Sequence, residues 1–109
     1  MTKTNNLQVA ETILHQLGGI HQLTAMIGAH SFTGSSKGNG SVTFKWKADA
    51  KYGANAATVT LEASDTYTVK FFKCHGYNIS EVTALEINDV YADMLVEMFE
   101  ESTGLYLSL

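Results

Sequence analysis

The 109-residue sequence has no proline, no arginine and only one cysteine, Cys74. The lack of proline excludes rigid proline-rich linkers and ligand segments. The lack of arginine argues against a sequence-specific DNA reader, because arginine is the main side chain for bidentate recognition of phosphates and base edges. A single cysteine cannot form an intrachain disulfide, which favours a reducing compartment.

Long apolar runs are also missing. Residues 1–6 are polar and lead directly into an amphipathic stretch, so the sequence shows no apolar core of a secretion signal. No run approaches the roughly 18 apolar residues that a membrane-spanning helix needs. We therefore expect a cytoplasmic protein with no membrane partner.

The composition that remains is that of one globular domain over residues 1–109. Hydrophobic residues make up 45% and charged residues 17% of the chain, and the length leaves no room for two cores. The net charge of −4 is unevenly spread: the first 74 residues hold all seven lysines and four acidic residues, whereas the last 35 hold seven acidic residues. We expect a mildly basic sheet and an acidic C-terminal end.

The first 40 residues are predicted to be mainly helical. Apolar residues at helical spacing indicate a helix over residues 6–18, which Gly18 and Gly19 end. Residues 20–28 fit a short second helix, although a short apolar run does not separate helix from strand. Residues 29–33 could form a short strand, and the composition of residues 33–40 indicates a loop.

Period-two alternation predicts strands at 42–47, 58–62 and 66–71, and weaker alternation indicates a fourth at 77–84. One face of these strands is apolar and the other is polar, so the sheet has one buried and one solvated face. The residues predicted to face the core are Val42, Phe44, Trp46, Val59, Leu61, Tyr67, Val69 and Phe71.

A C-terminal helix is predicted from about residue 89 to residue 103. Asn88 or Asp89 would cap it, Val90 and Tyr91 would open its apolar stripe, and Gly104 would end it. The apolar tail 105–109 should pack over the core. The predicted fold class is α+β: an antiparallel sheet of about four strands, with N-terminal and C-terminal helices packed on one face.

No catalytic, cofactor or metal motif stands out, so we expect a protein that is not an enzyme and that binds no cofactor or metal. The glycine-serine loop 34–41 lacks the phosphate-loop spacing and precedes a strand instead of a helix. A lone cysteine in a strand is more often a small buried hydrophobe than a nucleophile. Zinc-type spacing is absent among His15, His21, His30, Cys74 and His75.

The acidic residues of the C-terminal helix are the leading candidates for partner binding. Four of them could form a surface that docks on a basic partner or mimics a nucleic-acid backbone. The plainer interpretation is a solvated acidic helix face. The four residues are Asp93, Glu97, Glu100 and Glu101.

The polar sheet face suggests an alternative, a weak nucleic-acid-binding protein that uses Lys45, Lys47 and Lys70. Nucleic acid is the less favoured partner, because the alternation places the aromatic residues on the buried face, where they cannot stack on bases. A third hypothesis is a small-ligand pocket between residues 28–40 and the last helix, near His30 and Tyr91. An exposed edge strand or the apolar tail could also support a homo-oligomer.

Several stretches are informative when taken together: Leu17-Gly18-Gly19, Ala25-Met26-Ile27-Gly28-Ala29 with Phe32, Val59-Thr60-Leu61, Asp65-Thr66-Tyr67-Thr68-Val69, Val90-Tyr91-Ala92-Asp93-Met94-Leu95 and the ending 99–109, FEESTGLYLSL. Together they resemble a family of small proteins, about this long, that bacteriophages and mobile elements encode and that usually carry no named function. The resemblance implies an accessory protein acting in the host cytoplasm, and it transfers no catalytic residue. The leading hypothesis is a non-enzymatic protein-interaction module that binds a host or phage protein, with inhibition of a host defence system as one form. The resemblance spans nearly the whole chain.

Overall fold

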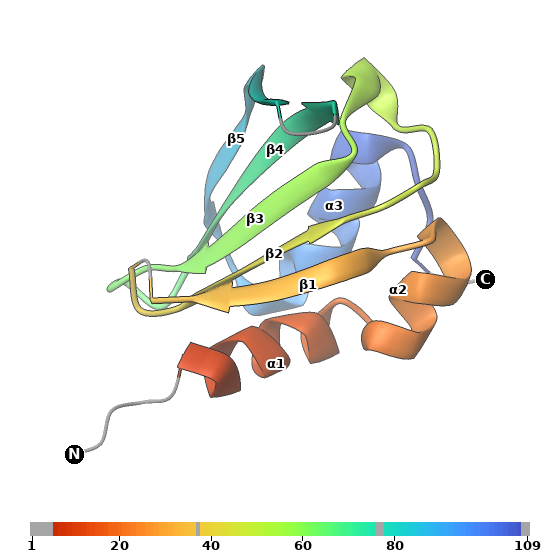
Figure 1. The fold of residues 1–109 in the computed structure, drawn as a ribbon. Helices are drawn as coiled ribbons and strands as arrows, with labels where there is room; N and C mark the ends of the chain where they lie inside the picture. The colour runs from red at the N-terminus through yellow and green to blue at the C-terminus, as the bar shows by residue number, and fades with distance from the viewer. Residues whose placement is uncertain (1–5, 37, 76–77, 108–109) are drawn as a thin grey trace.

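The computed structural model of the chain describes residues 6–36, 38–75 and 78–107, with the backbone alone at 6–7, 75 and 78–84. Helices stand at both ends of these residues and a sheet lies between them (Figure 1). The elements are α1 (Asn6–Gln16), α2 (Ile20–Ile27), β1 (His30–Ser35), β2 (Ser41–Lys45), η1 (Lys51–Gly53), β3 (Ala56–Leu61), β4 (Tyr67–His75), β5 (Asn78–Val90), η2 (Ala92–Met94) and α3 (Leu95–Thr103).

The sheet is a five-stranded antiparallel meander in the order β1-β2-β3-β4-β5, so each strand pairs with its neighbour in sequence. This confirms the α+β class and adds one strand to the expected four. The extra strand is β1, which takes in most of the ambiguous residues 29–33, extends through Ser35 into the stretch predicted as a loop, and pairs Gly34 with Val42. Its single large apolar residue, Phe32, gives little alternation, so periodicity could not establish the strand.

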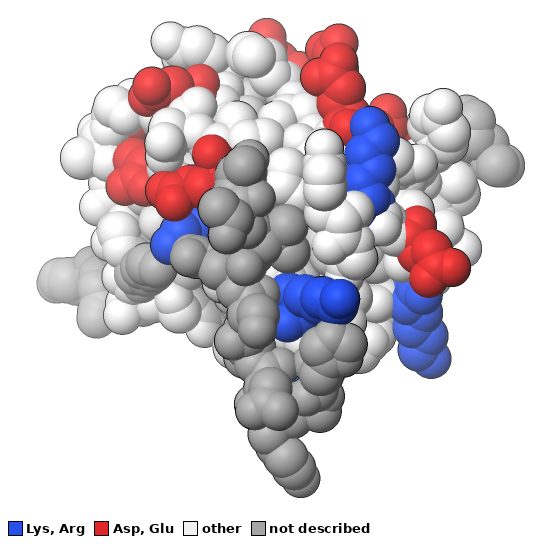
Figure 2. Space-filling model, turned by 90° about the horizontal axis from the view of Figure 1, so that it is seen from above, with Lys and Arg blue, Asp and Glu red and all other residues white. Residues whose placement is uncertain are grey.

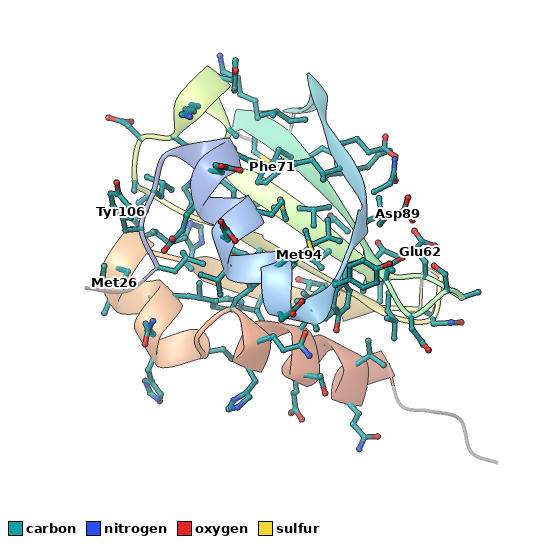
Figure 3. All side chains as sticks on the ribbon, turned by 180° about the vertical axis from the view of Figure 1, so that it is seen from behind. Met26, Glu62, Phe71, Asp89, Met94 and Tyr106 are labelled. Atoms are coloured by element: carbon teal, nitrogen blue, oxygen red, sulfur yellow. The ribbon has the colours of Figure 1, made fainter. Side chains whose placement is uncertain are left out.

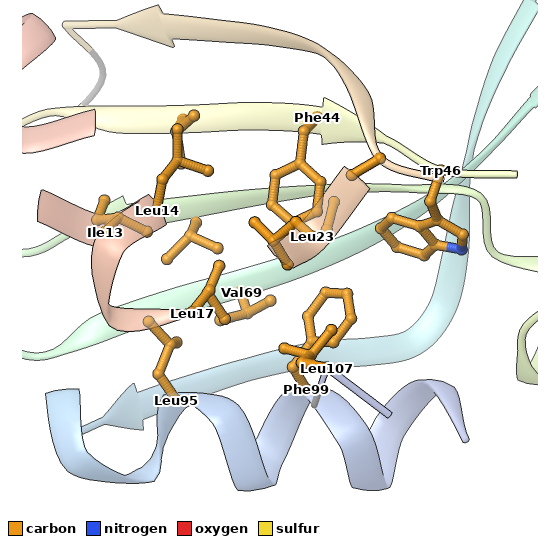
Figure 4. Packing of buried hydrophobic residues seen from close by; sticks show 14 of the residues in the cluster. Ile13, Leu14, Leu17, Leu23, Phe44, Trp46, Val69, Leu95, Phe99 and Leu107 are labelled. Carbon is orange, nitrogen blue, oxygen red and sulfur yellow. The ribbon is translucent and has the colours of Figure 1, made fainter. Parts of the chain in front are cut away.

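The predicted inner face of the sheet is buried. The register sets Val42 opposite Val59 and Val59 opposite Val69, and all three side chains are inaccessible to solvent. Buried residues of α1, α2 and α3 pack with this face in one hydrophobic cluster (Figure 4). The helices at both ends therefore cover the same side of the sheet, as predicted.

An aromatic cluster fills the middle of this core. The ring of Phe99 on α3 lies 5.3 Å from that of Trp46, 5.8 Å from that of Phe71 and 6.0 Å from that of Phe44. Phe32 of β1 also stacks on Phe44, with ring centroids 5.7 Å apart. Rings at these separations add stabilisation of about 0.5–1.5 kcal/mol per pair beyond the burial of their area.

The start of the C-terminal helix is where prediction and structure disagree. Asn88 and Asp89 belong to β5 instead of capping a helix, and α3 begins only at Leu95, after η2. Val90 pairs with Tyr67 of β4 and is 2% exposed, so it is a core residue of the sheet. Strand pairing and burial outweigh the local helical spacing here.

The segment between β2 and β3 is fastened to the sheet by Asn55. Its Nδ2 donates to the carbonyl of Cys74 (2.9 Å), and its Oδ1 accepts from the Cys74 backbone N–H (2.7 Å). Its backbone N–H donates to the carbonyl of Phe72 (2.9 Å), and its carbonyl accepts from the N–H of Trp46 (2.9 Å). Asn55 thus continues the hydrogen-bond ladder one residue before the start of β3 and fixes the position of η1.

Leu105 and Leu107 of the C-terminal tail pack on the core, as expected from its composition, whereas residues 108–109 lie outside the described residues. Leu107 is 1% exposed and belongs to the hydrophobic cluster. The Leu107 N–H donates to Oε2 of Glu100 (2.8 Å), and its carbonyl accepts from Nε2 of Gln22. Within the described ranges, no helix has the length and apolar character to cross a bilayer.

Candidate protein-binding site at the end of the C-terminal helix

A hollow of about 430 Å³ lies at the C-terminal end of α3. Three of the four acidic residues singled out from the sequence line it, whereas Asp93 is exposed in η2 and lies outside it. Three carboxylates and one ammonium group give the hollow a net negative charge. Its lining residues are Lys51, Glu97, Glu100, Glu101, Gly104 and Tyr106.

Helical periodicity positions the acidic residues of the hollow. Leu95, Phe99 and Thr103 recur at every fourth position, are all buried and hold α3 against the sheet. Glu97 and Glu101 are exposed, because they lie on other faces of the helix. The spacing that anchors the helix thus fixes the orientation of the acidic face.

The helix end folds back sharply at Gly104, which brings the tail beside α3. Gly104 has φ +77, and its N–H donates to the carbonyl of Glu100 (2.8 Å). Glycine adopts this left-handed conformation without a Cβ clash. Thr103 supports the turn: its Oγ1 donates to the carbonyl of Phe99 (2.8 Å) and accepts from the N–H of Leu105 (3.1 Å).

Lys51 joins the opposite wall of the hollow to the helix end. Its Nζ donates to the main-chain carbonyl of Glu101 (3.1 Å). A cation at this position compensates the partial negative charge at a helix C-terminus. The neighbouring residue Tyr52 has φ 61, an uncommon conformation for a residue with a bulky side chain. The η1 segment is therefore held in a specific shape beside the hollow.

Tyr106 presents an aromatic ring at the rim of the hollow. Its side chain is 71% exposed, although it stands between half-buried Leu105 and buried Leu107. The contacts of Leu107 with Gln22 and Glu100 hold the backbone on one side of the ring. An exposed ring beside carboxylates suits lysine and arginine side chains, through cation–π contact and charge-assisted hydrogen bonds. Figure 3 shows Tyr106 on this tail, with Met94 at the other end of α3.

The three lysines of the alternative hypothesis do not form one patch. Lys45 and Lys70 lie on the outer face of the sheet, whereas Lys47 follows the end of β2, and its N–H donates to the carbonyl of Ile27 in α2 (3.1 Å). Nζ of Lys70 lies 3.9 Å from Oε1 of Glu86. In the view of Figure 2, lysines stand beside acidic side chains instead of forming a basic surface. The aromatic residues predicted to face the core, Phe44, Trp46, Tyr67 and Phe71, are buried on the other face.

A second hollow, of about 240 Å³, lies on the outer face of the sheet. Two hydroxyls, two carboxylates and one ammonium line it, so its chemistry is polar and of mixed charge. Sequence reasoning missed it because its residues come from three strands and two loops. They are Gly38, Thr60, Glu62, Thr68, Lys70 and Glu86.

The histidines and Cys74 form no recognisable chemical centre. Nδ1 of His30 lies 2.9 Å from Oγ of Ser31, with both residues exposed, and neither His30 nor Tyr91 lines either hollow. Cys74 is half-buried, and the side chain of His75 lies outside the described residues. Among the described side chains, no three of His, Cys, Asp and Glu gather as metal ligands.

Tyr67 is a titratable group with a structural role. Burial raises the pKa of its phenol above the usual 10.0, and the hydrogen bond with Gln16 opposes that shift. The Tyr67 hydroxyl donates to Oε1 of Gln16 at 2.8 Å. This bond ties β4 to the last turn of α1.

Comparison with known proteins adds no further assignment. No family model, curated protein or solved structure matches the chain. The interpretation of the α3 hollow therefore rests on its own chemistry. Two of its residues, Lys51 and Tyr106, gave no signal in the sequence: the first lies in a segment without clear periodicity, and the second lies in a tail expected to be covered.

Proposed function

We propose that this protein is a non-enzymatic interaction module that binds a basic segment of a partner protein at the end of α3. The observation that carries the proposal is the 430 Å³ hollow, where carboxylates of α3 surround an open space beside the exposed ring of Tyr106. The phage or mobile-element context comes from the family resemblance alone. In that context the partner is a host or phage protein, and inhibition of a host defence system is one form the activity could take.

Glu97 and Glu101 would provide most of the attraction, since both are exposed and neither holds the tail. Glu100 has a different role, because its Oε2 accepts from the Leu107 N–H and shapes the hollow. Asp93 lies one helical turn before Glu97 and would extend the negative potential toward the approaching partner. Binding of this kind depends on exposed charges, so its affinity should fall as salt rises.

The test is a pull-down from bacterial lysate, with and without nuclease, using three versions of the protein. One is wild type, one carries Glu97→Lys with Glu101→Lys, and the control carries Glu11→Lys with Asp49→Lys. The two double variants change net charge equally, and all four acidic residues are exposed. We expect a nuclease-resistant partner on wild type and control, with recovery reduced about tenfold or more on the α3 variant.

A partner retained equally by all three proteins would refute the role of α3. Recovery that disappears with nuclease would instead favour nucleic acid at the face of Lys45 and Lys70. A direct measurement with an arginine-rich peptide, by fluorescence anisotropy from low to high salt, gives the affinity of the hollow itself.

A further inference from the structure

The two edges of the sheet differ in how well they are protected against pairing with another strand. β5 carries Glu81, Glu86 and Asp89, and its pairing with β4 has register shifts. Charged residues and bulges are common ways to keep an edge strand from pairing. β1 has the sequence HSFTGS, with no lysine, acidic residue or proline, and only Phe32 among its six residues is even half-buried. Within the described residues, β2 flanks it on one side and no strand flanks it on the other.

We propose that β1 pairs antiparallel with β1 of a second copy of this chain, which joins the two sheets across a two-fold axis at Thr33. This inference does not depend on the proposed function. Ser31, with φ 60, lies within the register shift between His30 and Thr33, so the regular part of β1 follows Ser31. In an antiparallel strand of this length, alternate residues direct both N–H and C=O to the outer side, where the second copy can accept and donate.

The side chains of β1 suit self-pairing in this register. Thr33 would face its own copy, and threonine pairs across antiparallel strands are favourable. Phe32 would face Gly34 of the second copy. Both residues are on the inner side of the sheet, since Phe32 stacks on Phe44 and Gly34 pairs with Val42. An aromatic ring next to a cross-strand glycine covers the backbone that glycine leaves open.

The distribution of charge favours a second copy as the occupant. Four strand spacings of about 4.8 Å place β5 roughly 19 Å from β1, beyond a Debye length of about 8 Å at physiological salt. Two copies joined through β1 therefore keep their acidic edges apart, despite the net charge of −4 on each chain. Pairing through β5 would instead bring like charges together. Because β1 itself is neutral, the dimer should depend little on salt, unlike binding at α3.

The experiment is sedimentation equilibrium from micromolar concentration to about 1 mM, at low and high salt, on the full chain. A single strand pair buries little area, so we expect a weak dimer with a micromolar to millimolar Kd. Thr33→Lys places two like charges at the axis and should raise Kd by about tenfold or more. Ala92→Lys adds the same charge at the opposite end of the sheet, on an exposed residue, and should leave Kd unchanged.

A disulfide test locates the interface without relying on repulsion. Thr33→Cys, in a Cys74→Ser background, should form an intermolecular disulfide under mild oxidation, because directly paired Cα atoms lie within disulfide range. Ala92→Cys in the same background should not.

A wild-type chain that remains monomeric at about 1 mM would overturn the proposal, as would a dimer that Thr33→Lys leaves intact. The variant Glu97→Lys with Glu101→Lys should dimerise as wild type does. Dimerisation through β1 and binding at α3 can therefore be tested independently.

Discussion

The β1 edge of the sheet and the C-terminal end of α3 differ in charge and in shape. β1 is neutral and extended, and its backbone is its main means of contact. The end of α3 is acidic and hollowed, and its contacts come from side chains. Under the two proposals, one small domain would hold two recognition surfaces that respond to different conditions: salt should weaken binding at α3 and leave pairing at β1 nearly unchanged.

The sharpest test of this comparison removes, one at a time, two aromatic rings that stack on Phe44, one from α3 and one from β1. Phe99 of α3 is fully buried, whereas Phe32 of β1 is half-buried. We expect Phe99→Ala to lower the free energy of unfolding by about 3–5 kcal/mol, through lost burial and a cavity. Phe32→Ala should cost about 1–2 kcal/mol, because solvent already reaches that ring. Urea denaturation measures both losses. Equal losses would show that α3 and β1 contribute equally to the stability of the core.

The next largest effect concerns Asn55, which supports the η1 wall of the α3 hollow. Asn55→Ala removes both side-chain hydrogen bonds to the backbone of Cys74. We expect a loss of about 2 kcal/mol in the free energy of unfolding. Asn88→Ala, at an exposed position that accepts from Thr68, should cost within about 0.5 kcal/mol and serves as control. A loss at Asn55 no larger than at Asn88 would mean that η1 is held by other contacts.

Tyr106→Ala tests the α3 side without disturbing the core, since the ring is 71% exposed. The variant should weaken binding of an arginine-rich peptide by about 1 kcal/mol, roughly fivefold in Kd. Its melting temperature and its β1 dimerisation should match wild type. Tyr91→Ala removes another exposed tyrosine, 58% accessible and away from the hollow, and should leave peptide affinity unchanged. If both variants weaken binding to the same extent, the effect belongs to exposed aromatic area in general.

The smallest predicted effect is a dependence of stability on alkaline pH. Burial raises the pKa of Tyr67 in the folded state, so the unfolded chain loses that proton first as pH rises. The contribution of Tyr67 to the free energy of unfolding should be constant below the ordinary pKa of 10.0 and should be lost as pH rises through the higher folded-state value. Tyr67→Phe should remove this part of the decline, with a small constant loss from the missing bond to Gln16. Urea midpoints between pH 8 and pH 11 in both proteins provide the comparison; identical slopes would contradict it.

Prediction from sequence succeeded where a side chain's environment follows from local spacing. Alternation placed Val42, Phe44 and Trp46 on the buried face, and helical spacing placed α1 and α2. It failed at Asp89 and Val90, where pairing with a distant strand decides the conformation. The acidic face of α3 was predicted in large part, because it follows from one helix.

The remaining parts of the candidate site depend on contacts between segments far apart in sequence. Lys51 reaches Glu101 across 50 positions, and Asn55 reaches Cys74 across 19. Such contacts leave no periodic pattern in the sequence. The exposure of Tyr106 was missed for a related reason: the tail is apolar on average, and only its fold against α3 decides which residue faces solvent.

The meander order of the sheet has a consequence for how the chain is made. Each strand finds its partner in the segment just synthesised, so most of the sheet can form early and quickly while the chain leaves the ribosome. The core is incomplete until Phe99 and Leu107 arrive, because both fill the space beneath the sheet. While α1, α2 and the sheet are in place and α3 is still missing, the part of the aromatic face that Phe99 and Leu107 cover would stay exposed. The last helix and tail end that period of exposure to aggregation and to chaperones.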